Sequence, residues 1–364
     1  RWYFQMGRGG DGTFSPSLMS DFLREAGGVA VIDGGLATEL ERHGADLNDP
    51  LWSAKCLFNS PHLIRAVHLD YLEAGADIII TASYQATIQG FEAKGFSIAE
   101  SETLLKRSVE IAFEARDMYY QRCKDGLCDG SRLEGIFNSR TVLVAASVGS
   151  YGAYLADGSE YSGDYGDAVT VKILKDFHRR RVQILAAAGA DLIAFETVPN
   201  KLEAQAYVEL LEEADDINVP AWLSFNSKDG VNVVSGESFL ECATIADRCN
   251  KVVAVGINCT PPRYIHGLIS CIKKVTDKPI IVYPNSGESY DADRKEWVQH
   301  GGFRRRLHLL CKQLAARRGF RHWWLLQDHS THHQSIAQSP SQQARHSIKL
   351  EFYLKTSYLH NLCH

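Results

Sequence analysis

The feature that most constrains the fold is a short apolar run that recurs seven times between residues 28 and 284, separated by longer segments of helical character. The runs are nearly continuous rather than alternating, which is typical of parallel strands buried on both faces. Repeated strand–helix units of this kind predict a parallel α/β sheet, and their number suits a (β/α)₈ TIM-type barrel. A doubly wound open sheet is the alternative. The runs are VAVID (29–33), ADIIITAS (76–83), TVLVAAS (141–147), DLIAFE (191–196), PAWLSFN (220–226), VVAVGIN (252–258) and KPIIVYP (278–284).

Helix boundary signals and the glycine pattern support alternating strands and helices without a dinucleotide site. In SPHLIRAVHLDYLEAGA, Ser60 suits an N-cap, Pro61 the first helical position and Gly75 the end of the helix. None of the strands is followed by the glycine fingerprint of a dinucleotide site. The GxGxxG match at residues 7–12 has no strand before it, so we interpret it as part of a flexible N-terminal stretch.

The composition changes near Gln299. Residues 299–364 contain ten Lys and Arg but two acidic residues, and nine of the fourteen histidines, whereas the rest has 29 basic and 42 acidic residues. An eighth strand of the expected character is missing after residue 284. We therefore predict a flexible extension (1–27), a barrel domain (28–298) whose first and seventh strands have unpaired edges, and a divergent basic, His-rich tail (299–364).

Bulk properties exclude several classes of function. A net charge of −5 and a pI near 6.3 predict no nucleic-acid partner and no membrane partner. The N-terminus has no signal-peptide core, so the expected location is cytoplasmic. The nine cysteines are then expected as thiols or ligands rather than disulfides. The pairs Cys123/Cys128 and Cys242/Cys249 lack the spacing of a zinc knuckle, and the tail histidines are not expected to form a native metal site.

Barrel enzymes build their sites at the carboxyl ends of the strands. Asp33 with the glycines after it could be functional or a turn. Glu196 ends a buried strand and must be paired, either with a substrate amino group or in a structural salt bridge. Cys259 could be a metal ligand or a packed thiol. The loop at 151–165, rich in glycine and tyrosine, could be functional or a surface excursion.

Seven stretches together carry a family resemblance: DGGLATEL, DPLW (49–52), EAGADIIITASYQAT, GSYGAYLADGSEYSG, AFET, GINCTPP and VYPNSGE. From about Gly28 to Trp297 the chain resembles homocysteine S-methyltransferases, especially the plant and bacterial type that uses S-methylmethionine. The resemblance implies a (β/α)₈ barrel and a zinc ion held by three cysteines. One of them maps onto Cys259. The other two belong to a GGCC motif at the end of the eighth strand, and this chain lacks that motif.

The resemblance also implies roles for individual residues. Asp33 and Glu196 would bind the amino group of homocysteine, Gly34 and Thr38 would shape the first loop, and Asn258 would support the turn that carries Cys259. Zinc would deprotonate the homocysteine thiol for attack on a sulfonium methyl group, giving methionine. The 151–165 loop would recognise the donor, because aromatic rings attract a sulfonium cation. Its sequence favours S-methylmethionine over S-adenosylmethionine.

The missing cysteines can be found by back-translation. When RGFRHWWLLQDHS (318–330) is written as degenerate codons and read one nucleotide later, it can spell GASVIGGCCRTTP. Tryptophan has a single codon, so Trp323-Trp324 fixes the two glycines. We hypothesise a frameshift, which also explains the unbalanced composition of the tail.

Three functional hypotheses follow. The first is zinc-dependent methyl transfer to homocysteine by the family's chemistry, with weak zinc binding and little activity expected from this chain, because a single thiolate is a poor zinc site. The second is a non-catalytic homocysteine-binding isoform. The third, Cys259 as a nucleophile without a metal, lacks a nearby histidine signal.

Overall fold

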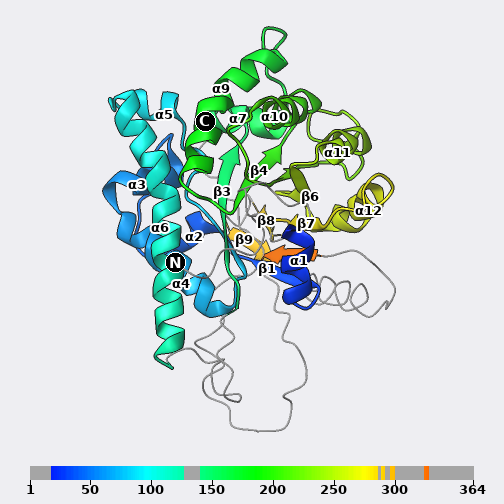
Figure 1. Ribbon diagram of the computed structural model, residues 1–364. Coiled ribbons are helices and arrows are strands. Elements are labelled where there is room, and N and C mark those ends of the chain that lie inside the picture. The colour runs from blue at the N-terminus through cyan, green and yellow to red at the C-terminus, as the bar shows by residue number, and fades with distance from the viewer. Residues whose placement is uncertain (1–17, 127–139, 286–287, 292–295, 300–323, 328–364) are drawn as a thin grey trace.

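Parallel strands close into a barrel in the computed structural model, which describes residues 18–126, 140–285, 288–291, 296–299 and 324–327 (Figure 1). Around the barrel the strands follow the order β1-β10-β7-β6-β5-β4-β3-β2. The predicted (β/α)₈ class is confirmed, and each of the seven predicted runs overlaps a strand. The strands are β1 (Val29–Ile32), β2 (Ile78–Ile80), β3 (Leu143–Gly149), β4 (Leu192–Val198), β5 (Ala221–Phe225), β6 (Val252–Asn258), β7 (Ile280–Tyr283) and β10 (Trp324–Gln327).

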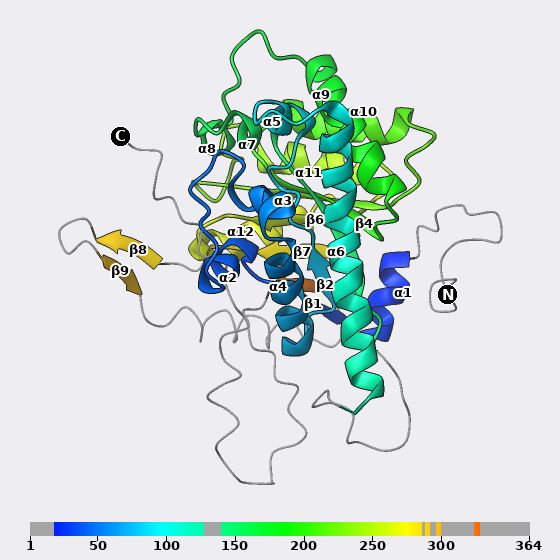
Figure 2. The ribbon, with the colours of Figure 1, turned by 90° about the vertical axis from the view of Figure 1, so that its left-hand side faces the viewer.

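Helices surround the barrel, and the long α6 lies along α4 (Figure 2). The predicted start and stop signals of α4 are confirmed: Ser60 is the N-cap residue, Pro61 opens the helix, and Gly75 ends it with φ 115°. The helices are α1 (Leu18–Glu25), α2 (Leu36–Arg42), a 3₁₀ helix (Trp52–Lys55), α3 (Cys56–Asn59), α4 (Pro61–Ala74), α5 (Ile88–Glu92), α6 (Ile98–Lys124), α7 (Tyr151–Leu155), α8 (Ser159–Ser162), α9 (Val171–Ala187), α10 (Lys201–Glu213), α11 (Phe239–Arg248) and α12 (Pro262–Ile272).

The core has two layers, because alternate residues of each strand face opposite sides of the sheet. In β3, Val144 and Ala146 pack outward against the helices, while Leu143 and Ala145 belong to the barrel interior. Trp222 and Ile281 fill that interior further. The strands are therefore buried on both faces, as their continuous apolar sequences predicted.

Two sequence-based expectations are wrong. The barrel is not open between β1 and β7, because β10 pairs with both, with Leu326 opposite Val31 and Val282. Backbone hydrogen bonds depend little on side-chain identity. A four-residue segment without the family motif can therefore still pair with the edges of β1 and β7 that would otherwise be open. The extension is also not flexible throughout: α1 buries Met19, Phe22 and Leu23 against the barrel interior. Residues 1–17 lie outside the described residues.

A separate antiparallel pair, β8 (Glu288–Asp291) and β9 (Glu296–Gln299), follows β7. Among the helices that the structure describes, none is both long and apolar enough to cross a membrane. The expected cysteine thiols Cys242 and Cys249 are buried, the first in the first turn of α11 and the second as its C-cap residue.

The buried His68 of α4 predicts sensitivity to acid. Its ring nitrogens have no hydrogen-bond partner among the described residues, and burial lowers the pKa of His68 to about 4. Between pH 6.5 and 4 the unfolded chain therefore binds a proton that the folded chain does not, so stability falls as the pH falls. We expect this histidine to remove about 2 kcal/mol of unfolding free energy between pH 7.5 and 5.

Urea unfolding at both pH values would measure the effect, with His68→Leu as the comparison. The variant should lose about 2 kcal/mol less than the wild type on acidification. An identical pH dependence in the two proteins would refute the assignment.

Candidate functional site

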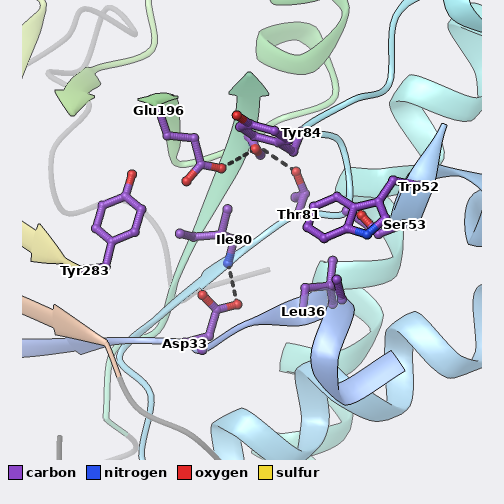
Figure 3. Close-up of a pocket in the computed structure, with 13 residues that line it drawn as sticks. Asp33, Leu36, Trp52, Ser53, Ile80, Thr81, Tyr84, Glu196 and Tyr283 are labelled. Atoms are coloured by element: carbon purple, nitrogen blue, oxygen red, sulfur yellow. Dashed lines mark hydrogen bonds between the residues drawn. The ribbon is translucent and has the colours of Figure 1, made fainter. Parts of the chain in front are cut away.

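A cavity lies at the carboxyl ends of the strands, the end at which barrel enzymes carry their chemistry. Figure 3 shows the carboxyl groups of Asp33 and Glu196 directed into this space, with Tyr283 on one side and Trp52 and Tyr84 on the other. None of its lining residues is Lys, Arg or His, so the described part of the wall carries acidic groups without basic ones. The lining residues are Asp33, Gly34, Leu36, Ala37, Trp52, Ser53, Ile80, Thr81, Ala82, Tyr84, Ser147, Glu196 and Tyr283.

Glu196 lies in β4 and is only 2% exposed. Its Oε1 accepts a hydrogen bond from the Ser147 hydroxyl of β3. Its Oε2 has no hydrogen-bond partner within the described residues. A buried carboxylate oxygen without a donor is costly, so this atom is suited to a donor that arrives with a ligand.

Asp33 follows β1 directly and is 1% exposed. Its Oδ2 accepts a hydrogen bond of 2.8 Å from the backbone N–H of Ile80 in β2. This bond fixes the first loop against the neighbouring strand. Asp33 is thus positioned structurally and still contributes to the same cavity as Glu196.

Cys259 occupies a strained turn after β6. Its φ is 46°, and Thr197 after Glu196 has φ 59°, a left-handed conformation that is rare for a β-branched residue. Asn258 connects the two positions: its Oδ1 accepts from the Thr197 N–H at 2.9 Å, and its Nδ2 donates to the Thr197 hydroxyl at 2.7 Å. Such conformations cost about 1–3 kcal/mol each and persist where the surroundings enforce them, often at functional sites.

The Cys259 sulfur accepts hydrogen bonds from Thr197 Oγ1 at 3.6 Å and from Asn258 Nδ2 at 3.4 Å. The thiol is partly exposed, unlike the fully covered Asn258. The sulfur is therefore oriented by two polar neighbours at the mouth of the barrel rather than packed among apolar groups.

Aromatic residues form part of the cavity wall. Trp52, with φ 46°, and Tyr84 meet edge to face with ring centroids 6.5 Å apart. Burial, and then the nearby Glu160 carboxylate, raise the pKa of Tyr84 well above its usual value. Tyr84 and Tyr283 lie at the ends of predicted strands, but the sequence alone gives neither a role. Trp52 was visible as part of DPLW, but only the fold brings it to the cavity.

The 151–165 loop folds into the short helices α7 and α8. The rings of Tyr151 and Tyr154 pack against Phe177 of α9, with centroids 4.9 and 5.1 Å away. Glu160 accepts a hydrogen bond of 2.8 Å from the Tyr84 hydroxyl, which joins this segment to the cavity wall. Burial, and then Glu160, raise the pKa of the adjacent Tyr161.

The structure brings some of the predicted site residues together and leaves others apart. Asp33, Gly34 and Glu196 line one cavity. Thr38 lies in α2 and does not line the cavity. Asn258 and Cys259 do not line it either; both hydrogen-bond to Thr197, the residue after Glu196.

The described residues do not fit a metal centre. No three His, Cys, Asp or Glu side chains within the described residues come together as metal ligands. Cys259 would be one ligand, and its polar neighbours are an amide and a hydroxyl. The residues around the cysteine therefore do not form a tetrahedral site of three thiolates. The tail histidines lie outside the described residues.

Comparisons with known proteins point to one family. The family model described as homocysteine S-methyltransferase matches residues 30–318. Homocysteine S-methyltransferase 2 of Arabidopsis thaliana is 72% identical over 284 residues, which cover 78% of this chain and 84% of that protein. A selenocysteine methyltransferase of Astragalus bisulcatus is 70% identical over 288 residues, covering 79% of this chain and 85% of that protein.

Among solved structures, the homocysteine methyltransferase MmuM of Escherichia coli in its metallated form has a TM-score of 0.69 and 38% identity. The alignment covers 86% of this chain and 94% of MmuM. In this form MmuM holds a metal.

Proposed function

Because this chain belongs to the homocysteine S-methyltransferase family, we propose that its barrel binds homocysteine as the acceptor of a methyl group. The product would be methionine. In the reaction, a bond forms between the homocysteine sulfur and the methyl carbon, the bond between that carbon and the donor sulfur breaks, and the acceptor thiol loses its proton.

The observation that carries the proposal is the pair of buried carboxylates in one cavity. An α-amino group is a cationic donor of several hydrogen bonds, and Glu196 Oε2 is an acceptor without a partner in the described residues. Asp33 adds a second negative charge to the same wall. We assign the amino group of homocysteine to these two residues, with Gly34 and Thr38 shaping the first loop.

We propose S-methylmethionine as the donor, in preference to S-adenosylmethionine. Its positive charge suits the side of the site where Glu160 lies beside Tyr84. Of the loop tyrosines expected to face the donor, Tyr151 and Tyr154 instead pack against Phe177, so Tyr84 and Tyr161 become the candidate rings.

We further propose zinc as the metal of the complete family site, with Cys259 as one ligand supported by Asn258. This chain's described residues do not supply the other ligands. The frameshift hypothesis supplies them as the Cys-Cys pair encoded one frame over from Leu325-Leu326.

A second function, homocysteine binding without methyl transfer, is favoured because Cys259 is the one thiol that the described residues place at the barrel mouth. A free thiol has a pKa near 8.5, so only a few per cent of homocysteine is the nucleophilic thiolate at neutral pH. Without a group that removes this proton, the site would still bind homocysteine, but methyl transfer would be slow.

We therefore expect the purified chain to bind homocysteine and to form methionine from S-methylmethionine at a rate at least about 100-fold below that of a family member with three cysteines. Calorimetry and a product assay on the same preparation would measure both quantities. Comparable turnover in the two proteins, together with retained stoichiometric zinc, would contradict the expectation.

A further inference from the structure

A buried charged cluster lies behind the 151–165 loop, outside the cavity. Glu203 of α10 is 0% exposed, and His178 and Arg181 of α9 are 0% and 2% exposed. Arg181 Nη2 donates to His178 Nδ1 at 2.8 Å, and His178 Nε2 lies 2.8 Å from Glu203 Oε1. Since Arg181 can only donate, His178 Nδ1 is the acceptor and Nε2 donates to Glu203.

The cluster holds the loop at both of its ends. Arg181 Nη2 donates to the carbonyl of Gly149 at 2.6 Å, where β3 ends. Glu203 Oε1 accepts from the backbone N–H of Tyr151 at 2.6 Å, at the start of α7, and Oε2 accepts from the Tyr165 hydroxyl. Tyr165 in turn accepts from the backbone N–H of Gly152 at 3.2 Å.

The segment between these ends is tightly packed. A Cβ added to Gly152 would lie 2.4 Å from the backbone N of Glu160, so α7 and α8 are in backbone contact. Asn226 Nδ2, after β5, donates to the Glu160 carbonyl at 2.9 Å. The position of the Glu160 carboxylate beside Tyr84 therefore depends on how α7 is held.

Stability alone is a weak reason for such a cluster. Burying a carboxylate and a guanidinium costs solvation free energy that their attraction often does not recover. Glu203 and Arg181 bind the backbone at the start of the loop, and Glu203 also binds the Tyr165 hydroxyl at its end, so these contacts fix the course of the loop.

We propose that Glu203 is a positioning residue for the methyl-donor side of the site, acting through Tyr151 and Tyr165 on the segment that carries Glu160. The proposal rests on the proposed function, in which this segment meets the donor. Glu203 touches neither substrate. Its contribution is to keep the Glu160 carboxylate at the mouth of the barrel.

The test is Glu203→Gln in the full chain, with Glu212→Gln as the matched control, because Glu212 is an exposed glutamate on the same helix. Calorimetry would measure S-methylmethionine and homocysteine separately. We expect Glu203→Gln to weaken S-methylmethionine binding about tenfold and to change homocysteine binding less than twofold. The control should change neither.

Amide hydrogen exchange of residues 150–165 gives a second readout that does not depend on a ligand. Exchange should be faster in Glu203→Gln, and also in Tyr165→Phe, which removes one hydroxyl and leaves the carboxylate. Unchanged exchange in both variants, or equal losses of donor and acceptor affinity, would overturn the proposal. If the wild type binds no S-methylmethionine, the proposed donor is wrong, and the exchange measurement still decides whether Glu203 positions the loop.

Discussion

Replacing Glu196 by Gln should weaken homocysteine binding by about 100-fold or more. Removing one partner of a buried charge pair typically costs about 2–5 kcal/mol, because the other charge is left without compensation. In this cavity the ligand's ammonium would lose the carboxylate oxygen that has no other partner in the described structure. Glutamine has nearly the same size as glutamate, so the substitution tests the effect of the charge alone.

The same substitution should not destabilise the protein without ligand. The Oε2 oxygen of Glu196 is buried without a donor among the residues that the structure describes, and removing an unsatisfied charge is neutral or stabilising. Calorimetric titration and thermal unfolding of both proteins would separate the two effects. Homocysteine affinity within threefold of the wild type would remove Glu196 from the acceptor site, and a large loss of stability would make it structural.

Replacing residues 318–330 by the peptide encoded one frame over should create a metal site. We expect the chain carrying GASVIGGCCRTTP in place of RGFRHWWLLQDHS to bind zinc at least about 1,000-fold more tightly, because two further thiolates complete a three-sulfur set. Cobalt(II) substitution would show this as intense sulfur-to-cobalt absorption, and methionine formation should rise with it.

The strand register supports this expectation. Asn258 of β6 is level with Tyr283 of β7, and Val282 of β7 is level with Leu326 of β10. Neighbouring strands are about 4.8 Å apart, so the end of β10 lies about 10 Å across the barrel mouth from the Cys259 turn. Adding Cys259→Ser to the restored chain should abolish the gain. Equal zinc affinity of the restored and original chains would refute the frameshift hypothesis.

The sequence predicted the barrel well where burial dictates residue choice. Strands covered on both faces need continuous apolar runs, and residues such as Ile78 and Val255 satisfy that need. The eighth strand was missed because β10 is held by backbone pairing to β1 and β7, which carries no sequence signature. Helix α1 was missed because its eight residues are too few to show a sustained helical periodicity.

The site could be predicted only in part. Asp33, Glu196 and Cys259 were visible because a polar residue at the end of a buried strand breaks the apolar pattern. The contact between Glu160 and Tyr84 joins residues 76 positions apart, and the cluster around Glu203 depends on the packing of α9 against α10. These contacts follow from tertiary geometry, which neither periodicity nor spacing encodes.

The most direct test of the central claim is a calorimetric titration of homocysteine into the full chain, repeated in the presence of a chelator. The account predicts binding of one homocysteine per chain, unchanged by the chelator, because the carboxylates of Asp33 and Glu196 form the acceptor site without a metal. Absence of binding, or binding that the chelator abolishes, would contradict it.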